Sequence, residues 1–331
     1  MKIAVDAMGG DRAPRVVVEG AVQAVQEYNL DVVLVGDEPQ LRTELARFSR
    51  VPPRLTLEHA SETIGMDESP AVTVRKKRDS SINVAAQLVR EGKADALVSA
   101  GNTGAVVCAT TLAWRLLPKV ERPGIAVVFP TLNGVTVLID AGANIDPKPY
   151  HLLQYAIMGE VYCRYILKKD KVRIGLLNVG EEESKGPEFV REAHQLLEQS
   201  PLTFLGNAEG RDIFSGRYEV IVCDGFVGNV ALKISESLAG TIAEFLKQEL
   251  SRSLITRLGA LMVLSGFKNL KRKIDYAEYG GAPLLGVDGT CIICHGSSSA
   301  KAIKNAIRVA GEFVQYQVTQ HIIESIENVK V

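Results

Sequence analysis

Glycine-rich turns that carry polar side chains follow four apolar, strand-like segments of this chain. They cover residues 99–104 (Ser-Ala-Gly-Asn-Thr-Gly), 140–144 (Asp-Ala-Gly-Ala-Asn), 178–180 (Asn-Val-Gly) and 224–229 (Asp-Gly-Phe-Val-Gly-Asn). Glycine lets a ligand approach the backbone closely, and free amides at the start of a helix bind phosphate. In an open parallel α/β sheet, such turns lie at the carboxyl edge, where these folds bind ligands. The four turns therefore predict one composite anion site.

The first of these turns is the strongest candidate for holding phosphate. Gly101 and Gly104 leave the backbone open, Ser99 ends the strand, and Asn102 and Thr103 offer side-chain donors where a helix begins. No Gly-Lys-Ser or Gly-Lys-Thr follows, so the turn is not a Walker A loop and ATP is not implied. Residues of these types serve purely structural turns equally well, and that reading stays open.

The loop after the first strand places two carboxylates around a glycine pair. Asp6 and Asp11 flank Gly9 and Gly10, and the pair allows either close contact with a ligand or positive φ angles. A strand end with an acidic cap is the competing structural reading. The loop is not a dinucleotide-binding fingerprint, because no third glycine opens the next helix at the required spacing.

Two lysines follow the next polar turns. Lys148 comes shortly after Asn144, and Lys185 follows Asn178 behind three consecutive acids. An ammonium group can stabilise the negative charge that develops during transfer to phosphate, and Lys185 is our first candidate for that role. Runs of acids are more often solvated loops. We expect no metal site, because a hard cation needs more converging oxygens than residues 140–148 guarantee.

The last two polar segments also follow strands. Asp224 sits at a strand end before Gly225, Asn229 lies about where a helix would start, and Lys233 lies one turn further on. His295 and Ser297 follow the strand-like run 291–293 and face either the site or only their own turn. Cys291 to His295 matches a haem-attachment pattern in letters only, and we interpret these cysteines as core residues.

The elements that must position these residues alternate between strand and helix. We expect one α/β domain over residues 1–331, built as three α/β/α layers around a mostly parallel, doubly wound sheet. Residues 60–74 read as irregular, and 125–129 with 134–139 read as a hairpin or adjacent strands. The predicted strands are 2–6, 31–35, 55–59, 96–98, 173–177 and 218–223, and the predicted helices are 14–24, 39–48, 81–90, 105–116, 150–167, 187–199 and 230–250.

Residues 238–275 interrupt the alternation and predict a protruding amphipathic helical hairpin. Apolar residues recur there at helical spacing, and basic residues flank them. Such a hairpin lies on a membrane surface or packs against a dimer partner, and both readings remain open. The candidate contact residues are Leu254, Leu258, Leu261, Met262, Phe267, Lys271 and Arg272.

Composition narrows the classes of function. The 331 residues include 38 basic and 39 acidic side chains, so nothing favours nucleic acid as a partner. Five cysteines do not form a disulfide framework and fit a reducing cytoplasm. The N-terminus reads as the first strand rather than a signal peptide, and no apolar run is long enough to span a membrane.

The motifs together resemble the PlsX family of bacterial phosphate acyltransferases, over essentially the whole chain. Each motif is only moderately specific, but their order and spacing are highly specific. The resemblance rests on residues 6–11, 99–105, 140–144, 178–180 with 185–186, 224–229, 281–286 and 295–297.

The resemblance implies transfer of a long-chain acyl group from acyl carrier protein to inorganic phosphate, without a cofactor. The acyl phosphate would feed a membrane-bound glycerol-3-phosphate acyltransferase in phospholipid synthesis. It also implies a homodimer, a fold similar to phosphotransacetylase and isocitrate/isopropylmalate dehydrogenases, and a cytoplasmic enzyme at the inner face of the membrane. Lys185, Asp224, Asn229 and His295 are the candidate catalytic residues.

Two other functions remain to be distinguished from acyl transfer. A metal- and NAD-dependent decarboxylating dehydrogenase can be built on a similar fold, but it needs an acid cluster and an adenine-ribose site, and we find neither in the sequence. A non-catalytic phosphate-binding scaffold would keep the glycine-rich turns and lack turnover.

Overall fold

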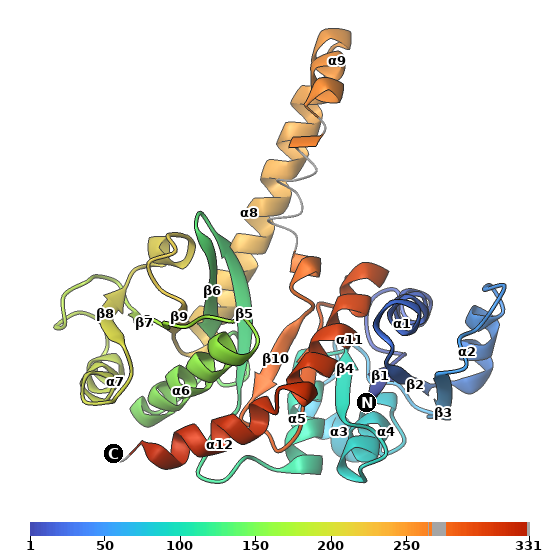
Figure 1. Cartoon of the computed structure of the whole chain (residues 1–331), viewed down its shortest axis with the longest axis horizontal. Coiled ribbons are helices and arrows are strands. Elements are labelled where there is room, and N and C mark those ends of the chain that lie inside the picture. The colour runs from blue at the N-terminus through green and yellow to red at the C-terminus, as the bar shows by residue number, and fades with distance from the viewer. Residues whose placement is uncertain (264, 267–275, 330–331) are drawn as a thin grey trace.

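The computed structural model describes residues 1–263, 265–266 and 276–329. In that part of the chain, 11 strands form one sheet in the order β3-β2-β1-β4-β11-β10-β5-β6-β9-β7-β8, with helices around it (Figure 1). The strands are β1 (Lys2–Asp6), β2 (Asp31–Gly36), β3 (Leu55–His59), β4 (Ala96–Ser99), β5 (Gly124–Thr131), β6 (Gly134–Ile139), β7 (Ile174–Leu177), β8 (Phe204–Ala208), β9 (Val220–Val222), β10 (Ala282–Leu285) and β11 (Cys291–Ile293).

Helices cover both faces of the sheet. They are α1 (Arg15–Tyr28), α2 (Glu38–Leu45), α3 (Pro70–Lys76), α4 (Ser81–Arg90), α5 (Thr103–Trp114), α6 (Pro149–Tyr165), α7 (Glu188–Glu198), α8 (Gly225–Ser251), α9 (Leu254–Met262), α11 (Ala300–Gln315) and α12 (Val318–Asn328). Two short 3-10 helices, η1 (Gly210–Phe214) and η2 (Tyr276–Glu278), complete the described elements.

Strand β1 shows why the chain forms three layers. Its side chains alternate between the two faces, as a strand requires. Ile3 and Val5 pack into the core shared with α1 and α11, whereas Ala4 packs into the core shared with α4 and α5. Both faces are apolar, so both must be covered. The predicted three-layer α/β/α fold is confirmed.

The sheet consists of two parallel halves that run in opposite directions. Strands β3, β2, β1, β4 and β11 are parallel to one another, and so are β6, β9, β7 and β8. Between them, β10 is antiparallel to β11 and to β5, and β5 forms the expected antiparallel pair with β6. The expectation that all four polar turns share one carboxyl edge is therefore wrong, because the two halves have their carboxyl ends at opposite edges.

Two helices depart from the sequence-based expectations. Residues 60–74, expected to be irregular, include the start of α3, with Pro70 at its first position. Helix α8 was expected from residue 230 but begins at Gly225, because the Asp224 side chain caps it and accepts a 2.8 Å hydrogen bond from the Val227 amide.

Helix α8 projects away from the sheet and continues into α9 (Figure 1). The expected amphipathic segment is helical over Leu254–Met262, whereas Phe267, Lys271 and Arg272 lie outside the described residues. None of the helices in the described ranges has the length and apolar character needed to cross a membrane.

Candidate active site

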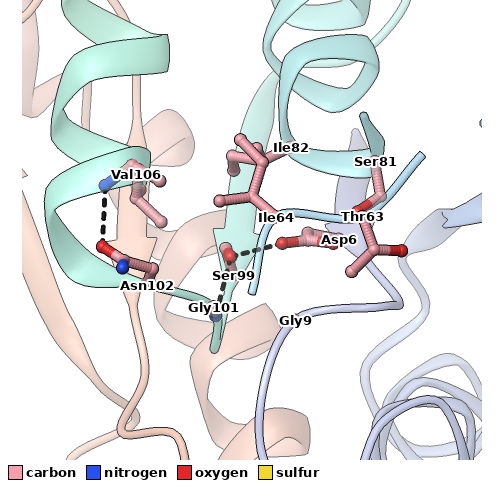
Figure 2. Close-up of a pocket in the computed structure, with 11 residues that line it drawn as sticks. Asp6, Gly9, Thr63, Ile64, Ser81, Ile82, Ser99, Gly101, Asn102 and Val106 are labelled. Atoms are coloured by element: carbon pink, nitrogen blue, oxygen red, sulfur yellow. Dashed lines mark hydrogen bonds between the residues drawn. The ribbon is translucent and has the colours of Figure 1, made fainter. Parts of the chain in front are cut away.

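Asp6 and Ser99 form the centre of a first polar group. They end the neighbouring strands β1 and β4 at the same level of the sheet. The Ser99 hydroxyl donates a 2.7 Å hydrogen bond to Asp6 Oδ2 and accepts one of 3.1 Å from the Gly101 amide (Figure 2). The Met8 amide donates to Asp6 Oδ1. Asp6 thus ties the loop after β1 to the phosphate-candidate turn after β4.

Burial dominates the electrostatics of Asp6. The carboxyl group is fully enclosed, and this loss of solvation raises its pKa above the ordinary value. Hydrogen bonds from the side chains of Ser81 and Ser99 and from the amides of Met8 and Gly9 oppose the rise. A carboxyl group held in this way is suited to fixing donors in place.

The two glycine loops of this group pack directly against each other. A Cβ atom on Gly9 would lie 2.6 Å from the Gly101 amide nitrogen and from Asp6 Oδ2, so only glycine fits there. Gly10 has a φ of 109° and lies beside Gly296, whose carbonyl accepts a 2.8 Å hydrogen bond from the Asp11 amide. The loops at residues 6–11, 99–104 and 295–297 are therefore brought together.

A small cavity opens beside this group (Figure 2). Polar atoms of Asp6, Ser81 and Ser99 face apolar side chains across it. Its lining residues are Asp6, Gly9, Thr63, Ile64, Ser81, Ile82, Ser99, Gly101, Asn102, Ala105 and Val106. Thr63, Ile64, Ser81 and Ile82 were missed as site residues, because Ser81 read only as a helix start and 60–74 as irregular.

Asn102 and Thr103 open α5 in different ways. Asn102 caps the helix, accepting from the Ala105 amide, and its own amide group donates to the carbonyls of Met66 and Glu68. Its side chain thus positions the turn, while Thr103 is exposed. The first amides of a helix have no partner within the helix, which is the property that suits this end of α5 to an anion.

Asp140 organises a second polar group. Its Oδ1 accepts from the amides of Ile125, Gly142 and Ala143, and its Oδ2 accepts from Asn144 at 2.7 Å. Burial raises the pKa of this carboxyl group against those four hydrogen bonds. The sequence predicted that Asp140 lies in a polar turn, but Asp140 was not among the predicted site residues. An acid followed by Ala-Gly-Ala-Asn is the signal for such a turn.

Helix α8 packs its first turn on this second group. The Gly225 amide donates a 2.9 Å hydrogen bond to the Asn144 carbonyl, and Gly228 lies against the Asp140 carbonyl with no room for a side chain. A Cβ atom on Gly142 would lie 2.6 Å from Asn229 Nδ2. Asn229 lies in the second turn of α8 rather than at its start, which corrects the predicted position.

The same helix reaches the first group. Lys233 Nζ lies 3.0 Å from His295 Nε2 and 2.9 Å from the Glu236 carboxylate, and His295 Nδ1 lies 2.8 Å from the Ser297 hydroxyl. Asn229 and Lys233 are one helical turn apart on α8. The two polar groups, which belong to opposite halves of the sheet, therefore converge along the first turns of this helix.

The remaining predicted residues lie less centrally. Asn178 follows β7, beside the end of β9 that leads to Asp224, and its side chain donates to the Lys185 carbonyl. Lys185 Nζ is 4.0 Å from Glu182, and Lys148 is exposed at the start of α6. Within the described residues, no hydrogen bond or ion pair links either lysine side chain to the two polar groups.

Cysteines, histidines and acids are the side chains that could bind a metal ion. Over residues 1–263, 265–266 and 276–329, no three His, Cys, Asp or Glu side chains gather as a metal-binding group. Cys291 and Cys294 are buried, and burial raises the pKa of Cys294 to about 12. These two thiols are core residues, as the sequence predicted.

Proteins of a known family are similar to this chain over nearly its whole length. Residues 1–321 match a family model described as "Fatty acid synthesis protein". The chain is 51% identical over 327 residues to the phosphate acyltransferase of Geobacter sulfurreducens, covering 99% of this chain and 94% of that protein. It is 53% identical over 331 residues to the phosphate acyltransferase of Pelotomaculum thermopropionicum, covering 100% and 96%.

Among solved structures, a phosphotransacetylase from Streptococcus pyogenes has a similar fold. It superposes with a TM-score of 0.62 at 19% identity, covering 99% of this chain and 94% of that one. At this identity the likeness concerns the fold alone, and it confirms the predicted similarity to the phosphotransacetylase fold.

Proposed function

The chain belongs to the PlsX family of fatty acid synthesis proteins, and from this we propose that it transfers an acyl group to inorganic phosphate. One observation in the structure supports the proposal most directly. Polar turns from both halves of the sheet meet along the first turns of α8, where Gly142 lies against Asn229 and where Lys233, which offers positive charge to an anion, lies beside His295.

The proposed reaction needs no side-chain nucleophile. A phosphate oxygen attacks the thioester carbonyl, the C–S bond breaks, and the thiolate leaves and takes up a proton. The protein has to hold phosphate close to the carbonyl and stabilise the oxyanion that develops. The start of α5, with the loops after β1 and β11, suits the first task, and Asn229 and Lys233 suit the second.

Each of the four candidate catalytic residues has a role in this proposal. Asn229 is a donor to the oxyanion, and Lys185 approaches the transferring phosphate from the loop after β7 once substrate is bound. Asp224 orients phosphate in addition to capping α8. His295, held between Lys233 and Ser297, supplies the proton to the leaving thiolate.

The acyl donor in this proposal is the long-chain thioester of acyl carrier protein. Its product, acyl phosphate, is consumed by a membrane-bound glycerol-3-phosphate acyltransferase that leads to phospholipid. The exposed apolar surface of α8 and α9 fits an enzyme that works at the surface of a membrane. We propose that a second copy of the chain covers α8, where Ile234 and Phe245 are each 62% exposed, and that α9 contacts the membrane.

Thiol release tests the proposed reaction. The purified chain is incubated with acyl carrier protein thioester, with and without phosphate, and free thiol is measured while acyl phosphate is trapped with hydroxylamine. We expect both products to form only with phosphate. Thiol release at the same rate with and without phosphate would contradict the proposal. Phosphate binding without any turnover would instead identify a scaffold, and reduction of added NAD would identify a dehydrogenase.

A further inference from the structure

A group of cations projects from the end of α3. Arg75, Lys76 and Arg78, which we call the basic edge, are exposed, and in the described part of the chain no carboxylate forms an ion pair with them. Lys77 in the same run behaves differently, because its ammonium is held by Glu68 at 2.7 Å and by the Thr63 carbonyl at 2.8 Å. One lysine thus anchors the segment, while the three cations around it face solvent.

The basic edge belongs to the border of the active site. Pro70, at the start of α3, packs on the phosphate-candidate turn so closely that a Cβ atom on Gly104 would lie 2.6 Å from its ring. Asn102 donates to the carbonyls of Met66 and Glu68, just before α3. Arg75 also lies close enough to α5 to lower the pKa of Cys108, against the burial that raises it. Figure 1 shows α3 beside α5.

The basic edge is held rigidly. The Asn83 side chain, from the neighbouring α4, donates to the carbonyls of Val74 at 2.9 Å and Lys77 at 2.7 Å, which fixes the last turn of α3. Thr73 and Val74 are buried beneath it. A partner would therefore meet preformed charges and lose little freedom in ordering them.

Nearby acids are already engaged. Glu68 is paired with Lys77, Glu62 accepts from the Asp79 amide, and Asp79 accepts from Ser61. Glu62 and Asp79 keep their negative charge, so the positive charge is concentrated at the three exposed cations of the basic edge, on a chain whose net charge is -1. Val72, one helical turn before Lys76, is 49% exposed and adds apolar surface. Such a combination of cations and apolar surface fits an acidic protein surface.

We propose that the basic edge docks the acidic protein that carries the acyl thioester. This inference rests on the proposed function and adds to it where the donor binds. Docking at α3 would place the carrier next to the turn that holds phosphate, so that its thioester arm enters the site from this side. Cations in a last helical turn also favour the helix slightly, and a purely structural role would affect stability only.

The test reverses two charges and compares carrier binding with chemistry. In Arg75→Glu/Lys76→Glu, affinity for fluorescently labelled acyl carrier protein, measured by anisotropy, should fall about tenfold or more at low salt. The loss should shrink as salt rises through about 0.15 M, where screening acts over about 8 Å. The control Arg50→Glu/Arg90→Glu makes the same charge change at exposed sites elsewhere and should bind as the wild type does.

Kinetics complete the test. In the docking variant, the KM for the carrier thioester should rise in step with the loss of binding, while the KM for phosphate and the unfolding midpoint stay unchanged. Equal weakening in the docking variant and the control would overturn the inference, and so would unaltered carrier binding in both. A wild type that binds the carrier but releases no thiol would overturn the proposed reaction and leave the docking result standing.

Discussion

A single buried carboxyl group, Asp6, holds two loops of the candidate site together. It accepts from Ser99 on one side and from the Met8 amide on the other, inside a wall of glycine backbone. Desolvation raises its pKa, and its hydrogen bonds only partly compensate. An ionised Asp6 is therefore less stable in the folded chain than in the unfolded chain, and this cost has a pH dependence that can be measured.

Asp6→Asn should remove that dependence. A carboxyl group whose pKa is raised on folding contributes stability below its unfolded value of 3.8, and that contribution is lost as pH rises through the folded pKa. The wild type should therefore lose stability relative to Asp6→Asn by about 1.4 kcal/mol for each unit of the rise in pKa. Urea unfolding between pH 4 and about 8 measures the difference.

The control for this comparison is Asp67→Asn, at an exposed site whose carboxylate forms no ion pair among the described residues. Its stability should follow the wild type across the pH range. A constant offset between Asp6→Asn and the wild type at every pH would show that Asp6 keeps an ordinary pKa after folding.

At the scale of elements, two glycines allow α8 to pack closely on the Asp140 turn. Gly225 and Gly228 bring the helix onto the Asp140 turn so closely that backbone touches backbone. Further along the same helix, none of the described residues comes within 4 Å of a Cβ position on Gly240. One helix therefore offers a glycine that packing requires and a glycine that packing does not require.

Gly228→Ala should destabilise the chain, because its methyl group would collide with the Asp140 carbonyl, and overpacking costs about 1–3 kcal/mol. Gly240→Ala should instead stabilise it by up to about 1 kcal/mol, the difference in helix propensity. Chemical denaturation of both variants measures these changes. Similar effects of the two substitutions would mean that α8 does not depend on close packing at Asp140.

The start of α8 shows how far sequence could predict the elements. Asp224 and Gly225 were placed correctly at a strand end, but the helix was expected five residues too late because Gly225 and Gly228 read as turn residues. Their real role is close packing on Asp140, a contact between residues distant in sequence. Helix α3 was missed although Ser69 and Pro70 are typical of a helix start, because the helix has only seven residues.

At the scale of the whole molecule, the motifs predicted the three-layer fold but not the direction of its two halves. The reversal depends on the β5–β6 hairpin and on β10, which returns from the C-terminal part of the chain to pair between them. Nothing local in residues 282–285 announces that pairing. Helix α8, rather than a shared sheet edge, brings Asn229 and Lys233 toward His295, and a composite anion site there stays a prediction.

The exposed surface of α9 leads to a prediction about location. Ile255 and Met262 are 82% and 86% exposed on a helix that stands clear of the sheet (Figure 1). Ile255→Glu/Met262→Glu should reduce co-sedimentation with anionic liposomes about tenfold, because a charged side chain is costly to bury among lipid chains. Thiol release and the oligomeric state in solution should be unchanged.

The matched control is Leu132→Glu/Val51→Glu, which adds the same charge at exposed apolar sites elsewhere. It should sediment with liposomes as the wild type does. If Ile255→Glu/Met262→Glu instead dissociates an oligomer and keeps its lipid binding, α9 belongs to the interface between copies.

The 27 residues of α8 form one uninterrupted rod, about 40 Å long. Its first turns carry Asn229 and Lys233, and the residues toward its other end are exposed. Because a long helix is stiff, tilting its far end must also rotate its first turns. A partner that binds the far end must therefore restrict the motion of Asn229 and Lys233. A contact made at the far end of α8 should therefore also affect Asn229 and Lys233, which the proposed function assigns to the oxyanion.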